Sequence, residues 1–133
     1  MNWIKVAQLS VTVINEVIEI MKENKMEGNS MQINRYITRG ISEHLSLDLQ
    51  ILLWNMVKER DNQPDTDYLH IFRLQEDENI LSITHEQEQP AYKLEYHYTN
   101  YEKNQNALPK KVYVIREDDV DLSYYVMLLP EEY

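Results

Sequence analysis

The hydrophobic residues of this chain change their spacing once, and that change limits the fold. Between Leu45 and Val57 they recur every three or four positions and widen to cover most of a helical circumference, which predicts a buried helix. Beyond Pro64, apolar and polar residues alternate, which predicts strands. A helix followed by a run of strands favours an α+β fold: a buried helix on one face of a mostly antiparallel sheet of about five to six strands.

Residues that favour turns and helix caps set the expected boundaries. Ser46 is expected to cap the central helix, and Asp48 lies in its first turn, where the helix dipole favours a negative charge. Gly40 is expected to turn the chain before that helix. Asp77 and Glu78 are the expected turn of a hairpin. The predicted strands are residues 32–39, 68–76, 79–88, 91–99, 111–116 and 122–129.

The first thirty residues predict an amphipathic helix and a linker. Apolar residues recur at helical spacing at Ile4, Ala7, Val11, Ile14, Ile18 and Met21. We therefore expect residues 1–30 to precede a single α+β domain at 31–133. The helix either lies on the domain's own sheet or pairs with a second copy to form a homodimer. Polar residues interrupt its apolar run too often for a signal peptide or a membrane span, so a cytoplasmic protein is expected.

The composition excludes several function classes. Asp and Glu number 23 against 13 Lys and Arg, and the net charge of -10 disfavours direct binding to nucleic acid or to an anionic membrane. Two glycines cannot supply a phosphate-binding Walker loop or a dinucleotide-binding loop, and the absence of cysteine removes thiol chemistry. No spacing of serine, histidine and carboxylate indicates a catalytic group. The sequence therefore predicts that the protein is not an enzyme and uses no cofactor.

Two histidines require a separate argument. If the hairpin closes through Asp77 and Glu78, His70 lies opposite His85 on one face of the sheet. Two imidazoles at that distance could hold a divalent metal, but such sites normally use three or four ligands. The alternative is a solvated polar pair on the open face of the sheet. We expect no metal, and a small metal-dependent enzyme is the least favoured function.

Acidic residues and tyrosines predict an interaction surface. Residues 117–133 carry six acidic side chains and no basic one, and residues 61–89 carry eight against Arg73 alone. A negative surface of this kind steers a basic partner, and tyrosine is common at interfaces. The alternative is solvated charge beside half-buried strand tyrosines. The predicted partner-binding residues are Asp65, Asp67, Glu76, Asp77, Glu78, Tyr92, Tyr96, Tyr98, Glu117, Asp118, Asp119 and Asp121.

Two segments carry a family resemblance. RYITRGISEHLSLDLQILLWNMV, from Arg35 to Val57, and YVMLLPEEY, from Tyr125 to Tyr133, resemble the staphylococcal domain of unknown function number 960. The resemblance implies that the shared domain begins near Arg35 and that residues 1–30 are an addition. It brings no catalytic residues. We expect Arg35 and Arg39 to hold the C-terminal Glu131 or Glu132 through charge-assisted hydrogen bonds.

The favoured hypothesis is a small acidic protein-binding module encoded by a mobile element. It would inhibit a basic nucleic-acid-binding partner, such as a CRISPR nuclease, in the manner of an anti-CRISPR protein or DNA mimic. Small size, net charge and the mobile-element occurrence of the resembled family motivate it. The alternative is a regulatory or interaction protein of the bacterial cytosol whose partner has no connection with nucleic acid.

Overall fold

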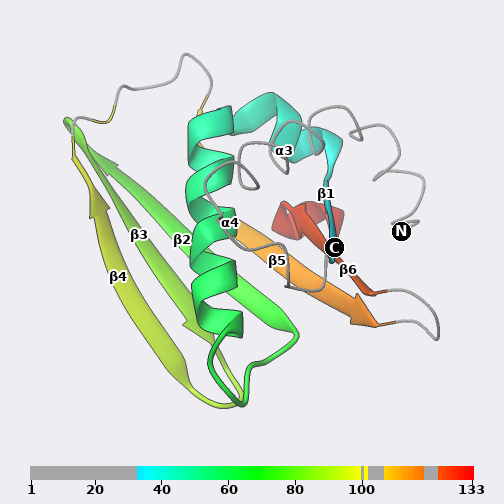
Figure 1. Ribbon diagram of the computed structural model, residues 1–133. Coiled ribbons are helices and arrows are strands. Elements are labelled where there is room, and N and C mark those ends of the chain that lie inside the picture. The colour runs from blue at the N-terminus through cyan, green and yellow to red at the C-terminus, as the bar shows by residue number, and fades with distance from the viewer. Residues whose placement is uncertain (1–32, 100, 102–106, 119–122) are drawn as a thin grey trace, which may run out of the picture.

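The computed structural model describes residues 33–99, 101, 107–118 and 123–133 (Figure 1). Within them lies one six-stranded sheet of order β1-β6-β5-β2-β3-β4. The strands are β1 (Asn34–Ile37), β2 (Leu69–Asp77), β3 (Ile80–Gln87), β4 (Tyr92–Tyr98), β5 (Lys111–Asp118) and β6 (Ser123–Leu128). The helices are α3 (Arg39–His44), α4 (Leu47–Asp61) and the 3-10 turn η1 (Pro130–Glu132). The helix expected in residues 4–21 lies outside the described residues.

The α+β class is confirmed, and the sheet is mixed, with one parallel pair of strands. Strand β1 pairs in parallel with β6, with Arg35 beside Tyr125. The other four pairings are antiparallel. A parallel pair requires a long crossover connection, and here the two helices and four strands between β1 and β6 provide it. Such a pairing joins distant parts of the chain, and the alternation along β1 does not reveal it.

Gly40 does not turn the chain as expected. Strand β1 stops at Ile37, and Thr38 is the N-cap of α3, where its Oγ1 accepts a hydrogen bond from the Ile41 amide at 3.3 Å. Gly40 lies inside that helix, and no described glycine has a positive φ. A Cβ at Gly40 would lie 2.7 Å from Cδ1 of Leu129, far inside a normal contact. Glycine at this position therefore allows the C-terminal segment to approach α3.

The side chain of Glu132 holds that segment in place. Its Oε1 accepts hydrogen bonds from Thr38 Oγ1 at 2.5 Å and from the Leu129 amide at 2.9 Å. Its Oε2 accepts one from the Gly40 amide at 3.2 Å. The prediction that Arg39 holds Glu131 or Glu132 is wrong, because Nε of Arg39 instead lies 3.6 Å from Oε1 of Glu43. A helix begins with unpaired N–H groups, and Glu132 supplies one of their acceptors.

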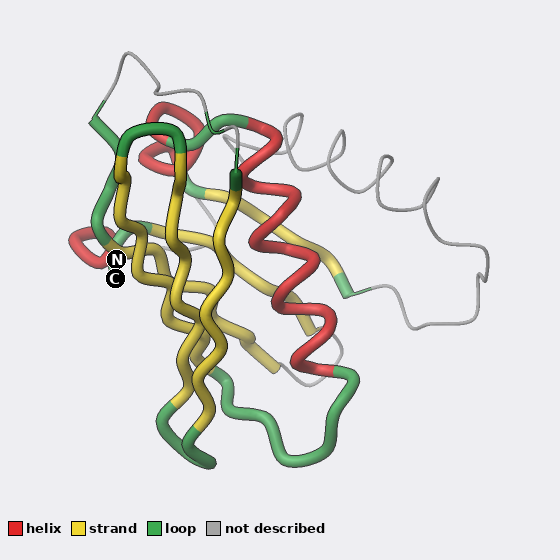
Figure 2. Tube along the Cα trace, turned by 90° about the vertical axis from the view of Figure 1, so that its left-hand side faces the viewer, coloured by secondary structure: helices red, strands yellow, loops and turns green. Residues whose placement is uncertain are grey.

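Helix α4 follows the predicted start closely. Ser46 is its N-cap and accepts from the Leu49 amide at 3.3 Å, and Asp48 lies in the first turn. The helix lies along one face of the sheet, as Figure 2 shows from the side. Its 15 residues make it about 22 Å long and, with side chains, about 10 Å wide. Six strands at about 4.8 Å spacing make the sheet roughly 24 Å wide.

The core lies between α4 and this face of the sheet. Trp54, Leu53, Phe72, Ile83, Val112, Val114 and Met127 are all fully buried there. A smaller cluster of Ile115, Val126 and Leu128 lies elsewhere, with half-buried tyrosines around it. Because α4 is narrower than the sheet, the edge strand β4 is left largely exposed. Within the described ranges, no helix is both long and apolar enough to cross a lipid bilayer.

We predict that Glu132→Ala lowers the free energy of unfolding by about 1–3 kcal/mol, because the partly buried donors of Thr38 and Gly40 lose their acceptor. Urea denaturation measures this change. The neighbouring Glu131 is exposed, so Glu131→Ala is the matched control and should change stability by less than about 0.5 kcal/mol. Equal effects of the two substitutions would show that the C-terminal segment is not held through Glu132.

Candidate functional site

The β2–β3 hairpin closes one residue later than predicted. Asp77 pairs with Ile80, so Glu78 and Asn79 form the two-residue loop. Glu78 has a φ of 54°, in the left-handed region that such tight hairpins require. The shift sets His85 directly opposite Phe72, and His70 therefore lies diagonally from His85. The predicted direct pairing of the histidines is wrong, but the two side chains still share one face.

The two imidazoles touch inside the core. His70 Nδ1 and His85 Nε2 lie 2.8 Å apart, and both residues are fully buried. The His85 ring stacks on Phe72 with ring centroids 4.4 Å apart, and Tyr92 meets it edge-on at 5.3 Å. The prediction of a solvated pair on the open face is therefore wrong. The histidines lie on the face that α4 covers, because the even positions of β2 point toward the helix.

A polar chain continues from the histidines across the sheet. His70 Nε2 lies 3.2 Å from Oδ1 of Asp61, the last residue of α4. The other carboxylate oxygen of Asp61 accepts a short hydrogen bond from the hydroxyl of Tyr125. The Arg35 guanidinium lies 5.9 Å from the ring centroids of both Trp54 and Tyr125. Arg35 therefore packs beneath the helix and does not hold the C-terminal segment as predicted.

The surroundings shift the protonation of these groups. Burial lowers the pKa of His85 to about 3, and the neighbouring His70 acts in the same direction. Burial is also the largest effect on Asp61 and raises its pKa, but the contacts with His70 and Tyr125 outweigh it, so the net pKa is lowered. Burial and the Asp61 carboxylate both raise the pKa of Tyr125. His85 is consequently neutral and Asp61 ionised near neutral pH.

A second set of contacts anchors the start of β4 to the helix. Arg60 donates from Nε to Gln87 Oε1 at 2.7 Å, and its guanidinium lies 4.2 Å from the centroid of the Tyr92 ring. Gln87 in turn donates from Nε2 to the backbone oxygen of Asp67 at 3.0 Å. The end of α4, the loop before β2 and the start of β4 are thus connected through one buried glutamine.

The two histidines of this interior chain are closed to solvent. His70 and His85 are fully buried, and a surface pocket is lined in part by Gln87 and Tyr92, which contact them. Among the described residues, no three His, Asp or Glu side chains are grouped so as to hold a metal ion. Chemistry at a site needs access for the reacting molecule. The network contributes buried contacts that join α4 to the sheet.

The predicted acidic residues fall at separate places. Asp67 lies beside the β3–β4 turn, since its Oδ2 accepts from the Gln89 amide at 3.4 Å, and Asp65 is two residues earlier in the same loop. Glu76, Asp77 and Glu78 belong to the hairpin at the opposite end of β3, where Leu81 pairs with Tyr98. The seven residues of β4 separate these two acidic ends by about 20 Å.

The remaining predicted carboxylates lie away from β4. Glu117 and Asp118 end strand β5, which two strands separate from β4. Asp118 accepts hydrogen bonds from Arg116 at 3.0 Å and from Ser123 at 2.7 Å, so its charge is partly used within the protein. Asp119 and Asp121 lie outside the described residues. The structure thus brings some predicted residues to the two ends of β4 but does not unite them all.

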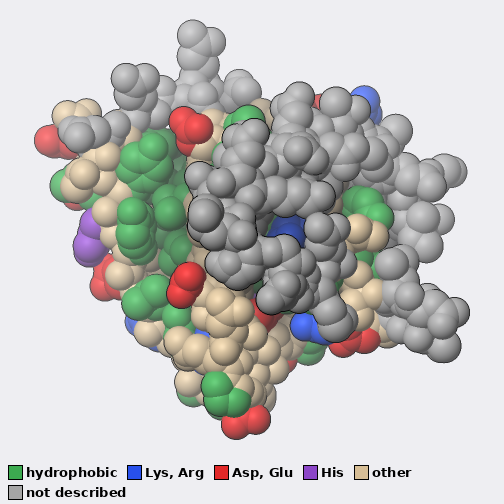
Figure 3. All heavy atoms as spheres, in the orientation of Figure 1, with side chains coloured by type: hydrophobic (Ala, Val, Ile, Leu, Met, Phe, Trp, Pro, Cys, Tyr) green, Lys and Arg blue, Asp and Glu red, His purple; other side chains and the backbone are tan. Residues whose placement is uncertain are grey.

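Between the acidic ends lies an apolar stripe. Alternate residues of β4 point to the α4 side, because they lie opposite residues of β3 that face the helix. The pairs are Tyr92 with Gln87, Leu94 with His85, Tyr96 with Ile83 and Tyr98 with Leu81. Leu94 is 46% exposed and Tyr96 43%. Figure 3 shows apolar side chains gathered on this side over β3 and β4. The prediction omitted Leu94, although its position in the alternation between Tyr92 and Tyr96 could have revealed it.

Comparison with known proteins gives a family and a fold. The family described as "Staphylococcal protein of unknown function (DUF960)" matches residues 34–132. A crystal structure of a protein of unknown function from Enterococcus faecalis superposes with a TM-score of 0.64 at 18% sequence identity. The match covers 82% of this chain and 98% of that one, and at this identity it shows the fold alone. No curated protein matches the sequence.

The buried His85 predicts a specific acid sensitivity. Its pKa is about 3 in the folded protein and about 6.5 in the unfolded chain, so below pH 6.5 only the unfolded state binds this proton. We predict that the free energy of unfolding falls by up to about 1.4 kcal/mol per pH unit between pH 6.5 and pH 3 from this group. Urea denaturation at pH 7 and pH 5 measures the slope.

In His85→Gln the slope between pH 7 and pH 5 should become shallower by about 1 kcal/mol per pH unit, whatever the absolute loss of stability. His97→Gln is the matched control, because His97 is exposed on β4 and should leave the slope nearly unchanged. An unaltered slope in His85→Gln would mean that His85 does not stay neutral inside the fold.

Proposed function

The chain belongs to the DUF960 family of staphylococcal proteins of unknown function, and we propose that it is a small acidic, non-catalytic module that binds a basic protein along strand β4. The observation that carries the proposal is the exposed stripe of Leu94 and Tyr96 on an edge strand with acidic residues at both ends. The burial of His70 and His85 supports the non-catalytic part, because their side chains are closed to solvent.

An edge strand provides the backbone groups for binding. Strand β4 is the last strand of the sheet, so one side of its backbone has no neighbouring strand in the described part of the chain. An extended segment of a partner can pair with such an edge, and alternate side chains then contact one face. Here that face carries Leu94 and Tyr96, which supply apolar area to bury, and tyrosine also keeps a polar tip for hydrogen bonding.

The charges favour a basic partner over a second copy. In an antiparallel pair of two β4 strands, the Tyr98 end of one copy meets the Tyr92 end of the other. Acidic side chains lie at both ends, Glu76–Glu78 near Tyr98 and Asp67 near Tyr92, so this pairing brings carboxylates together, although Arg60 and Lys93 at the Tyr92 end reduce the repulsion. A segment with Lys or Arg flanking its centre would instead be attracted at both ends.

The more specific form of the proposal concerns the partner's identity. A basic protein that binds nucleic acid, such as a CRISPR nuclease, presents the charge that the two acidic ends would attract, and the net charge of -10 supports this choice. The chain would then act as an inhibitor encoded by a mobile element. The alternative is a bacterial regulatory protein whose partner is neutral, and salt dependence separates the two.

We predict that the double variant Leu94→Ala/Tyr96→Ala folds normally but loses its partner. Both side chains are nearly half exposed, so each truncation should lower stability by only about 1 kcal/mol. Their loss from an interface centre should weaken binding at least about tenfold. Proteins retained from a bacterial lysate by the wild type and by the variant are compared by mass spectrometry, and the affinity for the purified partner is then measured.

Ile80→Ala is the matched control, because Ile80 is 42% exposed but lies at the hairpin and not on β4. The proposal requires a basic protein that wild type and Ile80→Ala bind alike, that the double variant loses, and that roughly 0.5 M salt weakens. A partner that the double variant retains would refute β4 as the binding strand. A neutral partner insensitive to salt would refute the electrostatic part and support the regulatory alternative.

A further inference from the structure

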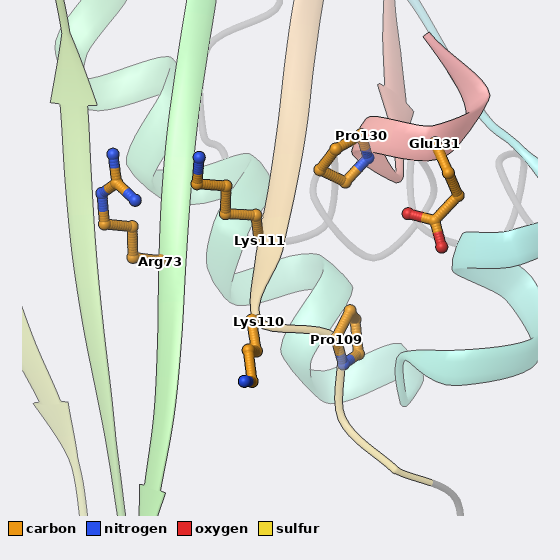
Figure 4. A pocket seen from close by; sticks show the side chains of 6 residues that line it. All are labelled: Arg73, Pro109, Lys110, Lys111, Pro130 and Glu131. Atoms are coloured by element: carbon orange, nitrogen blue, oxygen red, sulfur yellow. The ribbon is translucent and has the colours of Figure 1, made fainter.

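A pocket with three cations lies at the face of the sheet opposite α4, where β5 begins next to η1 (Figure 4). Its volume is about 450 Å³, and its lining residues are Arg73, Lys110, Lys111, Pro109, Pro130 and Glu131. The lining has three cationic side chains and one carboxylate, in a chain whose net charge is -10. Such a local reversal of charge needs an explanation, because the rest of the protein is acidic.

Two of the cations are held against each other by the sheet. Arg73 on β2 is directly opposite Lys111 on β5. The Leu74 amide donates to the Lys110 carbonyl at 2.9 Å, which makes Arg73 and Lys111 a non-hydrogen-bonded pair, the closer of the two antiparallel arrangements. Like charges directly opposite each other destabilise a sheet. The arrangement costs free energy unless something negative lies between the side chains.

The protein itself supplies only part of that negative charge. Glu86 lies 3.0 Å from Nε of Arg73, which leaves the two terminal nitrogens of the guanidinium without a hydrogen-bond partner in the described part of the chain. Lys110 and Lys111 have no ion pair with any described residue. Glu131 is exposed at the rim. The donors of Arg73 and Lys111 lie near each other and remain available to a bound anion, whereas the Lys110 ammonium points the other way and adds positive charge nearby (Figure 4).

We propose that this pocket binds the dianion of a phosphate monoester. An arginine fork and lysine ammonium groups are the usual protein ligands of phosphate, and the site stays positive even with Glu86 and Glu131 counted. The volume falls in the range of small-molecule pockets and exceeds what free phosphate fills. The rings of Pro109 and Pro130 offer apolar walls for the organic part of the ester. The pocket contains no residue of β4, and the proposed binding stripe of β4 lies on the other face of the sheet.

The test uses the full chain and follows backbone amide resonances by NMR at constant ionic strength. The probes are inorganic phosphate, phenyl phosphate and a short peptide with one phosphoserine, and sodium chloride serves as the blank. We expect the amides of Arg73, Lys110 and Lys111 to shift and saturate with phenyl phosphate, more tightly than with inorganic phosphate. Tighter binding of phenyl phosphate identifies a free small molecule as the ligand. Tighter binding of the phosphoserine peptide identifies a phosphorylated protein.

The double variant Lys110→Gln/Lys111→Gln should weaken binding of phenyl phosphate roughly tenfold or more, because the charge-assisted contact of Lys111 and the nearby positive charge of Lys110 are both lost. Lys93→Gln is the matched control, since Lys93 is an exposed cation on β4 outside this pocket, and it should leave the affinity unchanged. The proposal is overturned if the shifts remain linear with concentration, if they match the chloride blank, or if the double variant binds as tightly as the wild type.

Discussion

The sheet of this protein is wider than the helix that covers it, and the exposed surface follows from that mismatch. Helix α4 is about 10 Å across, whereas six strands span roughly 24 Å. Burying Trp54, Leu53 and Phe72 places the helix over the middle of the sheet. Strand β4 at one edge keeps Leu94 and Tyr96 in solvent. Exposed apolar residues on an edge strand are an aggregation hazard, which proteins retain where a partner uses them.

The polar chain beneath α4 fixes where the helix lies. Asp61 joins the end of the helix to Tyr125 on β6 and His70 on β2, and His70 continues to His85 on β3. Removing one member of a buried charged network costs about 3–5 kcal/mol, because the remaining groups lose their partners.

Local patterns predicted the elements well, and contacts between distant residues explain what they missed. Alternation and turn residues placed all six strands within a few residues, and Ser46 marked the start of α4. The predicted register of the hairpin was wrong by one residue because Glu78 adopts a left-handed φ, which glutamate seldom does. The roles of Gly40 and Glu132 depend on each other across 92 positions of sequence, and no local pattern shows such a contact. Carboxylates that were grouped along the chain were separated by the strand order.

The central claim is that β4 is the surface this protein uses. Hydrogen–deuterium exchange of the backbone amides, with and without a captured partner, tests it most directly because exchange reports which amides become hydrogen-bonded. The account predicts that Tyr92–Tyr98 gains protection in the complex while β1, at the opposite edge, does not change. Protection confined to other segments, with β4 exchanging as fast as in the free protein, would contradict it.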